Sequence, residues 1–270
     1  ERYVSSRSDS GLFSARWRYL EHLRALHDTE EILRVLRATL YEPADHVLLV
    51  NELEAQQRQR EALEAAQAAY RDFPDIPQVV EQLLRCYDRD GWDTEALVVR
   101  RAWFSRFPSA QGFLDLLRCA RAAKVDVDAL RAELWGCLET LEQAELARHA
   151  KMPGPRPDGP NVSLRLEILL LEKRVDDALV LAQRPHRADH RLLERLALAL
   201  PARQNGAAVE LLQRVFDWRM ARAQSPYSDV LDIVAKTLAR MPHERGRAWV
   251  AQLRGQFKAK RNFIKGLPDA

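Results

Sequence analysis

The chain has 270 residues, of which 47% are hydrophobic and 30% charged, and its formal net charge is +3. This is the composition of a soluble globular chain rather than of a disordered, collagen-like or membrane protein, and so small a charge implies no polyanion partner for the chain as a whole. With only 10 glycines and 13 prolines, long helices are expected instead of many short strands joined by tight turns.

The first predicted elements are two helices, at residues 17–24 and 29–40. They carry apolar residues at helical spacing, and Asp28 or Thr29 can cap the second helix. Together they form a helix pair that precedes the clearest pattern in the sequence.

An internal repeat with an offset of 34 residues follows this pair. Apart from one glutamate, the matched positions are apolar, small or aromatic, and a proline closes both copies. They are Glu61-Ala62-Leu63 with Glu95-Ala96-Leu97, Ala68 with Ala102, Tyr70 with Phe104, Phe73 with Phe107, and Pro74 with Pro108. Chance does not produce so many ordered matches at one offset, so we interpret the repeat as a structural unit.

Each copy is predicted to form two helices, at residues 47–56 and 60–73 in the first and at residues 79–87 and 94–107 in the second. Apolar residues recur there at about i, i+3, i+4 and i+7, which indicates amphipathic helices. A third copy at residues 113–138 diverges after its first matches. The sequence thus predicts an all-α fold, an α–α superhelix in which helix pairs stack as a solenoid.

The period of 34 and the closing proline resemble the tetratricopeptide repeat (TPR). The chain departs from that repeat at two places. His46 and Val80 stand where the family has an early tryptophan, and Val50 and Leu84 stand at the small residue of the first helix. The resemblance implies a degenerate, TPR-like helical-repeat solenoid.

A connector rich in proline and glycine, residues 152–160, separates an N-terminal repeat domain at residues 1–151 from a C-terminal helical region at residues 161–270. Such a segment cannot continue a helix. Ser225-Pro226 has the pattern of a helix start, with a capping hydroxyl before a proline. Helices are predicted at residues 162–173, 175–183, 189–200, 206–223, 226–241 and 244–260, and no strand is predicted.

Positive charge is concentrated in the tail, where residues 240–267 hold eight basic residues against one acidic residue, Glu244. Trp249, Leu253 and Phe257 fall on one face of the predicted last helix. Its basic patch comprises Arg254, Lys258, Lys260, Arg261 and Lys265. An amphipathic basic helix can hold an acidic partner or a phosphate backbone, and it can equally be the polar end cap that a solenoid needs; we favour the cap.

No motif points to catalysis or to a metal. His186 and His190 are four residues apart, a spacing that can share a metal on one helix. However, Arg187-Ala188-Asp189 has the pattern of a helix start and no third ligand is near, so we assign both histidines to surface or capping roles. The nucleotide-binding, hydrolase and zinc-protease motifs are missing. We therefore expect no enzymatic activity, no metal and no cofactor.

The cysteines and the ends of the chain suggest a cellular setting. Cys86, Cys119 and Cys137 form an odd set without CxC or CxxC spacing, which argues against a disulfide framework and a zinc site. We expect reduced thiols in a cytoplasmic protein, because neither a secretory signal nor a membrane span is found. The chain does not begin with methionine, which suggests a fragment of a longer protein.

The second half contains three stretches, residues 164–171, residues 177–182 and Lys258-Ala-Lys260-Arg-Asn-Phe-Ile264, together with Tyr227 after Ser225-Pro226. These resemble the C-terminal helical region of bacterial SWIM zinc finger family proteins. The resemblance implies a helical scaffold attached to a zinc module associated with nucleic-acid or protein contacts. The zinc motif itself, CxC followed by HxC, is absent, so the module either lies upstream of Glu1 or was never part of this relative.

Three functional hypotheses follow. In the first, a protein or peptide partner of unknown identity docks on the concave side built from the first helices of successive pairs. The candidate groove residues are His46, Asn51, Glu54, Gln78, Gln82 and Arg85. In the second, the chain is a nucleic-acid-binding accessory protein that uses the basic patch. In the third, it is an enzyme whose site assembles from distant residues.

Overall fold

The protein is described by a computed structural model that covers residues 16–151, 159–184 and 186–268. In this part of the chain all regular structure is helical, and the only strand-like pairing is one isolated parallel bridge between Asn161 and Arg187. The predicted all-α fold is confirmed. The chain divides into two compact units, one formed by the described residues up to Pro108 with Asp115–Leu130, the other by Ser109–Leu114 and the described residues from Arg131 onward.

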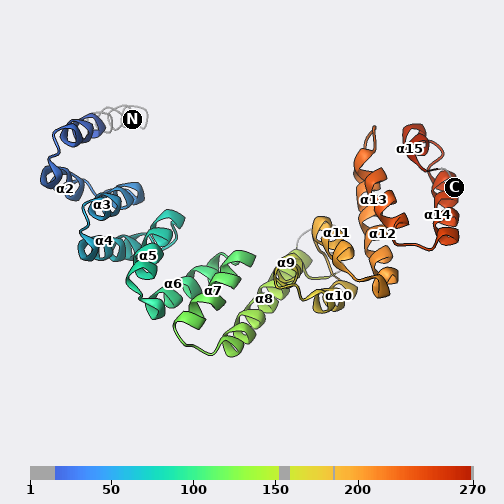
Figure 1. Cartoon of the computed structure of the whole chain (residues 1–270), viewed down its shortest axis with the longest axis horizontal. Coiled ribbons are helices and arrows are strands. Elements are labelled where there is room, and N and C mark those ends of the chain that lie inside the picture. The colour runs from blue at the N-terminus through green and yellow to red at the C-terminus, as the bar shows by residue number, and fades with distance from the viewer. Residues whose placement is uncertain (1–15, 152–158, 185, 269–270) are drawn as a thin grey trace. The chain divides into compact units, whose positions relative to one another are not determined.

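The first unit is an array of antiparallel helix pairs, in which consecutive helices lie side by side (Figure 1). Its helices are residues 16–25, α2 (Thr29–Ala38), α3 (Pro43–Ala55), α4 (Gln59–Asp72), α5 (Pro77–Asp90) and α6 (Asp93–Arg106). The first helices of the two repeat copies, α3 and α5, also contact each other. The 34-residue repeat is therefore a repeat of helix pairs, as the sequence predicts.

Small and apolar residues decide how these pairs pack. Ala62 and Ala66 of α4 are fully buried, which lets the neighbouring helices approach closely, and Leu53 of α3 is buried as well. Gly91 ends α5 in the left-handed conformation with φ of 72°, and its N–H donates to the Tyr87 carbonyl. The repeat predicts that Phe107 packs between successive helix pairs, but this residue is 47% exposed and lies against Trp103, because it follows the last residue of α6.

The third copy of the repeat forms two helices, α7 (Ala110–Ala122) and α8 (Val127–Ala150). Its second helix has 24 residues, whereas α4 and α6 have 14 each. This extra length is consistent with the divergence seen in the sequence after residue 130.

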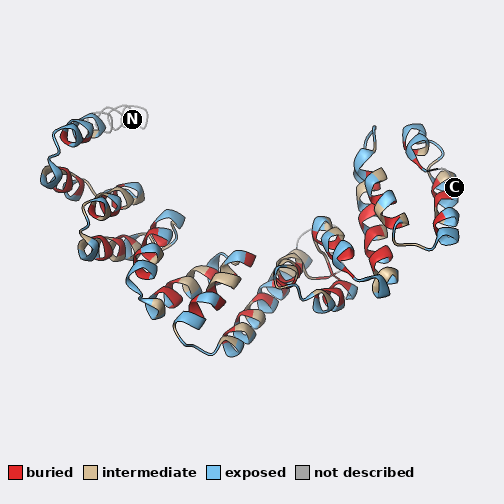
Figure 2. Ribbon diagram, in the orientation of Figure 1, coloured by how far each residue is buried: buried red, intermediate tan, exposed pale blue. Residues whose placement is uncertain are grey.

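The second unit continues the pattern of paired helices after residue 158. After α8, most of which belongs to this unit, its elements are α9 (Ser163–Leu171), α10 (Val175–Gln183), α11 (His190–Ala199), the short 3-10 helix η1 (Ala202–Gln204), α12 (Asn205–Arg222), α13 (Ser228–Leu238), α14 (His243–Gln256) and α15 (Arg261–Gly266). One hydrophobic cluster runs through them from Val162 to Leu267. Figure 2 shows buried and exposed residues alternating along the helices, as expected where each helix buries one face.

Two predicted helix boundaries in this unit are wrong. Helix α13 begins at Ser228 instead of Pro226, and its N-cap is Tyr227 in the left-handed conformation with φ of 64°. Helix α14 ends at Gln256, and the chain turns before α15 instead of continuing to residue 260. The turn lets Phe263 become fully buried, with its ring 6.1 Å from that of Phe216 and 5.6 Å from that of Phe257.

Most of the predicted connector, residues 152–158, lies outside the described residues. Its last two residues are held within the second unit, because the Pro160 carbonyl accepts from the Arg187 backbone N–H at 2.9 Å and the Gly159 carbonyl accepts from Arg187 Nε at 3.3 Å. The division into domains at residues 152–160 stays a prediction. No helix in the described ranges is both long and apolar enough to cross a membrane.

Replacing Phe263 with alanine should lower the free energy of unfolding of the second unit by about 3–5 kcal/mol, because it removes a fully buried aromatic ring. Urea unfolding followed by circular dichroism measures the loss. The matched control is Phe107→Ala, which truncates a phenylalanine that is 47% exposed and should cost much less. Equal losses in both variants would show that α15 does not close the core.

Candidate functional site

Four of the predicted groove residues meet between the first helices of the two repeat copies. Asn51 and Glu54 lie on α3, and Gln82 and Arg85 lie on α5; together with Arg89 we call them the polar ladder. Residues three or four apart share one face of a helix, so each helix presents its ladder residues along a single stripe. The exposed faces of α3 and α5 beside the ladder are called the first-helix face.

The ladder is a continuous set of hydrogen bonds. Asn51 Oδ1 accepts from Gln82 Nε2 at 3.1 Å and from Arg85 Nη2 at 3.0 Å. The Glu54 carboxylate accepts from Arg85 Nη2 at 3.1 Å and from Arg89 Nη1 at 3.0 Å. One carboxylate thus holds two guanidinium groups in place, and charge-assisted bonds of this kind are stronger than neutral ones.

Cys86 lies behind the ladder as an unreactive thiol. Burial, and then the negative charge of Glu54 with its carboxylate 3.6 Å from Sγ, raise the pKa of Cys86 to about 11. The thiolate is the nucleophile and the metal ligand, so this side chain is protonated and inert at neutral pH.

The groove predictions have different outcomes. Gln82, although it belongs to the polar ladder, is only 6% exposed, so its predicted exposure in the groove is wrong. His46 is also buried, with its ring edge-on to Phe73 at 5.4 Å, and its predicted exposure is wrong as well. The reason is that His46 stands where the tetratricopeptide repeat has its early tryptophan, and this position packs against the neighbouring helix. Gln78 is exposed near the start of α5, on the helix that carries Gln82 and Arg85.

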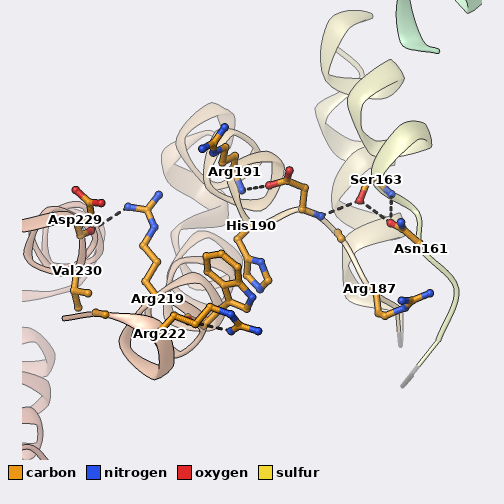
Figure 3. A pocket seen from close by; sticks show the side chains of 13 residues that line it. Asn161, Ser163, Arg187, His190, Arg191, Arg219, Arg222, Asp229 and Val230 are labelled. Atoms are coloured by element: carbon orange, nitrogen blue, oxygen red, sulfur yellow. Dashed lines mark hydrogen bonds between the residues drawn. The ribbon is translucent and has the colours of Figure 1, made fainter. Parts of the chain in front are cut away.

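A second candidate site is an open pocket of about 960 Å³ in the second unit (Figure 3). It is formed where α9, α11 and α13 begin and α12 ends. We call it the arginine pocket, because four arginines line it. Its polar and aromatic lining residues are Asn161, Ser163, Arg187, Asp189, His190, Arg191, Trp218, Arg219, Arg222 and Asp229.

Short hydrogen bonds fix one wall of the arginine pocket. Asn161 Oδ1 accepts from the Ser163 hydroxyl at 2.7 Å, and Ser163 Oγ accepts from the Asp189 backbone N–H at 2.9 Å. Asp189 is the N-cap of α11 and accepts from the Arg191 backbone N–H at 2.7 Å. The starts of α9 and α11 are therefore tied together.

The four arginines differ in how their charge is used. Arg187 pairs with Glu145 at 3.3 Å, and Arg219 pairs with Glu194 and also donates to the Asp229 backbone carbonyl at 3.0 Å. Figure 3 shows Arg219 and Arg222 of α12 on one side of His190, and Arg187, from the segment before α11, on the other side.

Arg222 is positioned by an aromatic ring instead of a carboxylate. Its guanidinium carbon lies 4.5 Å from the Trp218 ring centroid, and Nη1 donates to the Trp218 backbone carbonyl at 3.3 Å. The His190 ring stacks on Trp218 with centroids 4.1 Å apart. Burial lowers the pKa of His190, so this imidazole is neutral at pH 7. The sequence analysis missed this stack because residues 190 and 218 come from different helices.

The predicted surface role of His186 is wrong. This histidine is only 8% exposed and lines a cavity of about 750 Å³ with Gln143 and Arg184, while His190 begins α11 as predicted. Both ring nitrogens of His186 lack a hydrogen-bond partner within the described ranges. Among the residues that the structure describes, no group of His, Cys, Asp or Glu side chains could hold a metal ion.

The basic patch does not lie on one end helix, which corrects the prediction of a single basic helix there. Arg254 Nη2 donates to the Pro268 carbonyl at 3.0 Å, and Lys260 Nζ donates to the Met220 carbonyl at 3.3 Å. Lys258, Arg261 and Lys265 are exposed, but they are spread over the turn and α15. The turn after α14 separates the five residues.

Comparisons with known proteins add few constraints. No family model matches the chain, and no curated protein matches it. The chain is similar to a chain of the structure of Naa15/Naa10 bound to HypK-THB, with 15% identity and a TM-score of 0.38; the similarity covers 87% of this chain and 36% of that one. This chain thus spans about a third of that protein's length.

A second similar structure is TTC0263, a thermophilic TPR protein of Thermus thermophilus, with 16% identity and a TM-score of 0.29. That similarity covers 74% of this chain and 98% of that one. With such low scores, neither likeness assigns a function. The resemblance to SWIM zinc finger family proteins stays a prediction.

Replacing His186 with phenylalanine should flatten the pH dependence of stability between pH 7 and 5.5. Burial, and then the Arg214 guanidinium, lower the pKa of His186 in the folded protein. Its contribution to stability is therefore full above the unfolded pKa of about 6.5 and decreases as the pH falls, by at most about 1.4 kcal/mol per pH unit for one proton.

Urea unfolding at several pH values measures this slope. His243→Gln is the control, because it replaces an exposed histidine at the start of α14 and leaves His186 in place, so it should keep the pH dependence that His186→Phe loses. An unchanged slope in His186→Phe would mean that His186 is protonated as readily in the folded as in the unfolded chain.

Proposed function

We propose that the chain is a non-catalytic helical-repeat scaffold that binds a protein or peptide partner on the first-helix face. In stacked helix pairs each pair contacts only its neighbours, which leaves one face of successive first helices free for binding. The observation that carries the proposal is the polar ladder, which fixes polar side chains of α3 and α5 at this face before any partner arrives.

The ladder offers hydrogen-bond donors to a partner. The Arg85 side chain is 58% exposed, and of its nitrogen atoms only Nη2 is engaged in contacts between described residues. Asn51 is exposed and uses Oδ1 as an acceptor, while its amide group makes no hydrogen bond to the described part of the chain. Guanidinium and amide groups donate several hydrogen bonds each.

These donors fit an extended peptide. An extended chain exposes backbone carbonyl oxygens at regular intervals, and immobilised donors bind them with little further loss of side-chain entropy. The Glu54 carboxylate compensates part of the positive charge nearby, which favours neutral carbonyl acceptors over strongly acidic ones.

A double substitution tests the proposal. Asn51→Ala with Arg85→Ala should lower the recovery of a bound partner at least about tenfold in affinity capture from a cell extract, because one charge-assisted hydrogen bond is worth about 1.5–3 kcal/mol. The matched control is Arg60→Ala with Glu64→Ala, which removes an exposed ion pair of α4. Equal recovery by the ladder and control variants would contradict the proposal.

The same experiment addresses the nucleic-acid alternative. Nuclease treatment of the extract should leave capture by the first-helix face unchanged. A loss of capture on nuclease treatment, together with sensitivity to changes at Lys258, Arg261 and Lys265, would favour a nucleic-acid-binding accessory protein instead.

We also propose a cytoplasmic setting and a distant relation to SWIM zinc finger family proteins. The cytoplasmic setting is supported by the three free cysteines, of which Cys86 and Cys119 are buried thiols. The relation is supported by the Lys-Arg-Asn-Phe stretch at residues 260–263, in which Asn262 bonds the Ser225 hydroxyl at 2.7 Å and Phe263 is buried.

A further inference from the structure

We propose that the arginine pocket of the second unit binds an acidic peptide segment, with Arg191 and Arg222 receiving its carboxylates. The pocket is a different surface from the first-helix face, and it takes a ligand of different charge. Its volume of about 960 Å³ lies at the upper end of the range for ligand pockets.

The charges around the pocket are unevenly paired. Arg187 and Arg219 are each paired with a glutamate, Glu145 and Glu194. In the described part of the chain, Arg191 and Arg222 make no ion pair with a carboxylate, although both line the pocket. Two guanidinium groups are therefore left to pair with an incoming anion.

Arg222 is prepared for this contact. Stacking on Trp218 covers the flat face of its guanidinium, and the backbone carbonyl of Trp218 holds Nη1. The remaining N–H groups lie in the plane of the guanidinium, and this fork matches the two oxygens of a carboxylate. A stacked guanidinium also loses less side-chain freedom on binding than a free one does.

The pocket favours an acidic peptide over a nucleic acid for two reasons. Single-stranded nucleic acids bind by stacking bases on aromatic rings. The Trp218 ring already has His190 at 4.1 Å and Arg222 at 4.5 Å from its centroid, so two side chains of the protein already cover this ring. In addition, Asp189 and Asp229 line the pocket, and they repel a chain with a phosphate on every residue more than a peptide in which glutamates alternate with neutral residues.

Neutral His190 fits the same ligand. Because burial lowers its pKa, the imidazole adds no charge at pH 7, and the attraction comes from the arginines alone. Asp189 is already engaged as the N-cap of α11, so its carboxylate is not displaced when a peptide enters.

Fluorescence anisotropy with defined probes tests the proposal. The probe is a fluorescein-labelled octapeptide of alternating glutamate and glycine, and the reference probe has glutamine in place of glutamate. We expect the glutamate peptide to bind at least tenfold more tightly than the glutamine peptide. Arg191→Gln with Arg222→Gln should weaken its binding at least tenfold.

The control variant is Arg195→Gln with Arg203→Gln, which removes the same charge from exposed arginines outside the pocket and should bind as the unmodified protein does. Circular dichroism verifies that both variants fold. Failure to bind the glutamate peptide, or equal weakening by the pocket and control variants, would overturn the proposal.

Two further probes separate this pocket from the other surfaces. A labelled RNA octamer that bound more tightly than the glutamate peptide, and that lost binding in the pocket variant, would also overturn the proposal. Asn51→Ala with Arg85→Ala should bind the glutamate peptide normally, so the failure of one site does not imply the failure of the other.

Discussion

The structure depends on one constraint: a helix in such an array can bury its apolar stripe only against the next helix. An isolated amphipathic helix is marginal in water, so each pair is stabilised by its neighbours along the chain. Fully buried Ala62 and Ala66 let α4 approach those neighbours closely, and the same logic extends through the single apolar cluster of the second unit. Because packing repeats with every pair, the sequence repeats with it.

The same periodicity produces the polar ladder. Asn51 and Arg85 are 34 residues apart, which makes them equivalent positions of consecutive pairs, and stacking brings Arg85 Nη2 to 3.0 Å from Asn51 Oδ1. A polar residue on the open face of one first helix therefore meets its counterpart on the next. This is why four of the six predicted groove residues lie together, whereas His46, at a packing position of the repeat, is buried.

The sequence predicts the helices where apolar residues recur periodically. It does not predict helix boundaries and sites that depend on contacts between residues far apart in the chain. The helices of the repeat were predicted within a few residues, because apolar spacing specifies them locally. Ser225-Pro226 has a sound capping pattern, but α13 begins at Ser228. Residues 244–260 have a sound helical pattern, but the chain turns after Gln256, and Phe263 packs against Phe216. The arginine pocket draws on the starts of α9, α11 and α13 and the end of α12, and no local pattern connects them.

The two candidate surfaces use arginine in opposite ways. In the polar ladder a carboxylate positions the guanidinium groups, so Glu54 compensates charge while it orders Arg85. In the arginine pocket a ring positions Arg222, and Trp218 orders the guanidinium without cancelling its charge. An ordered guanidinium whose charge is partly compensated suits neutral acceptors such as backbone carbonyls. An ordered guanidinium whose charge is not compensated suits carboxylates. A partner that carried an extended segment and an acidic segment would therefore find complementary chemistry in both units.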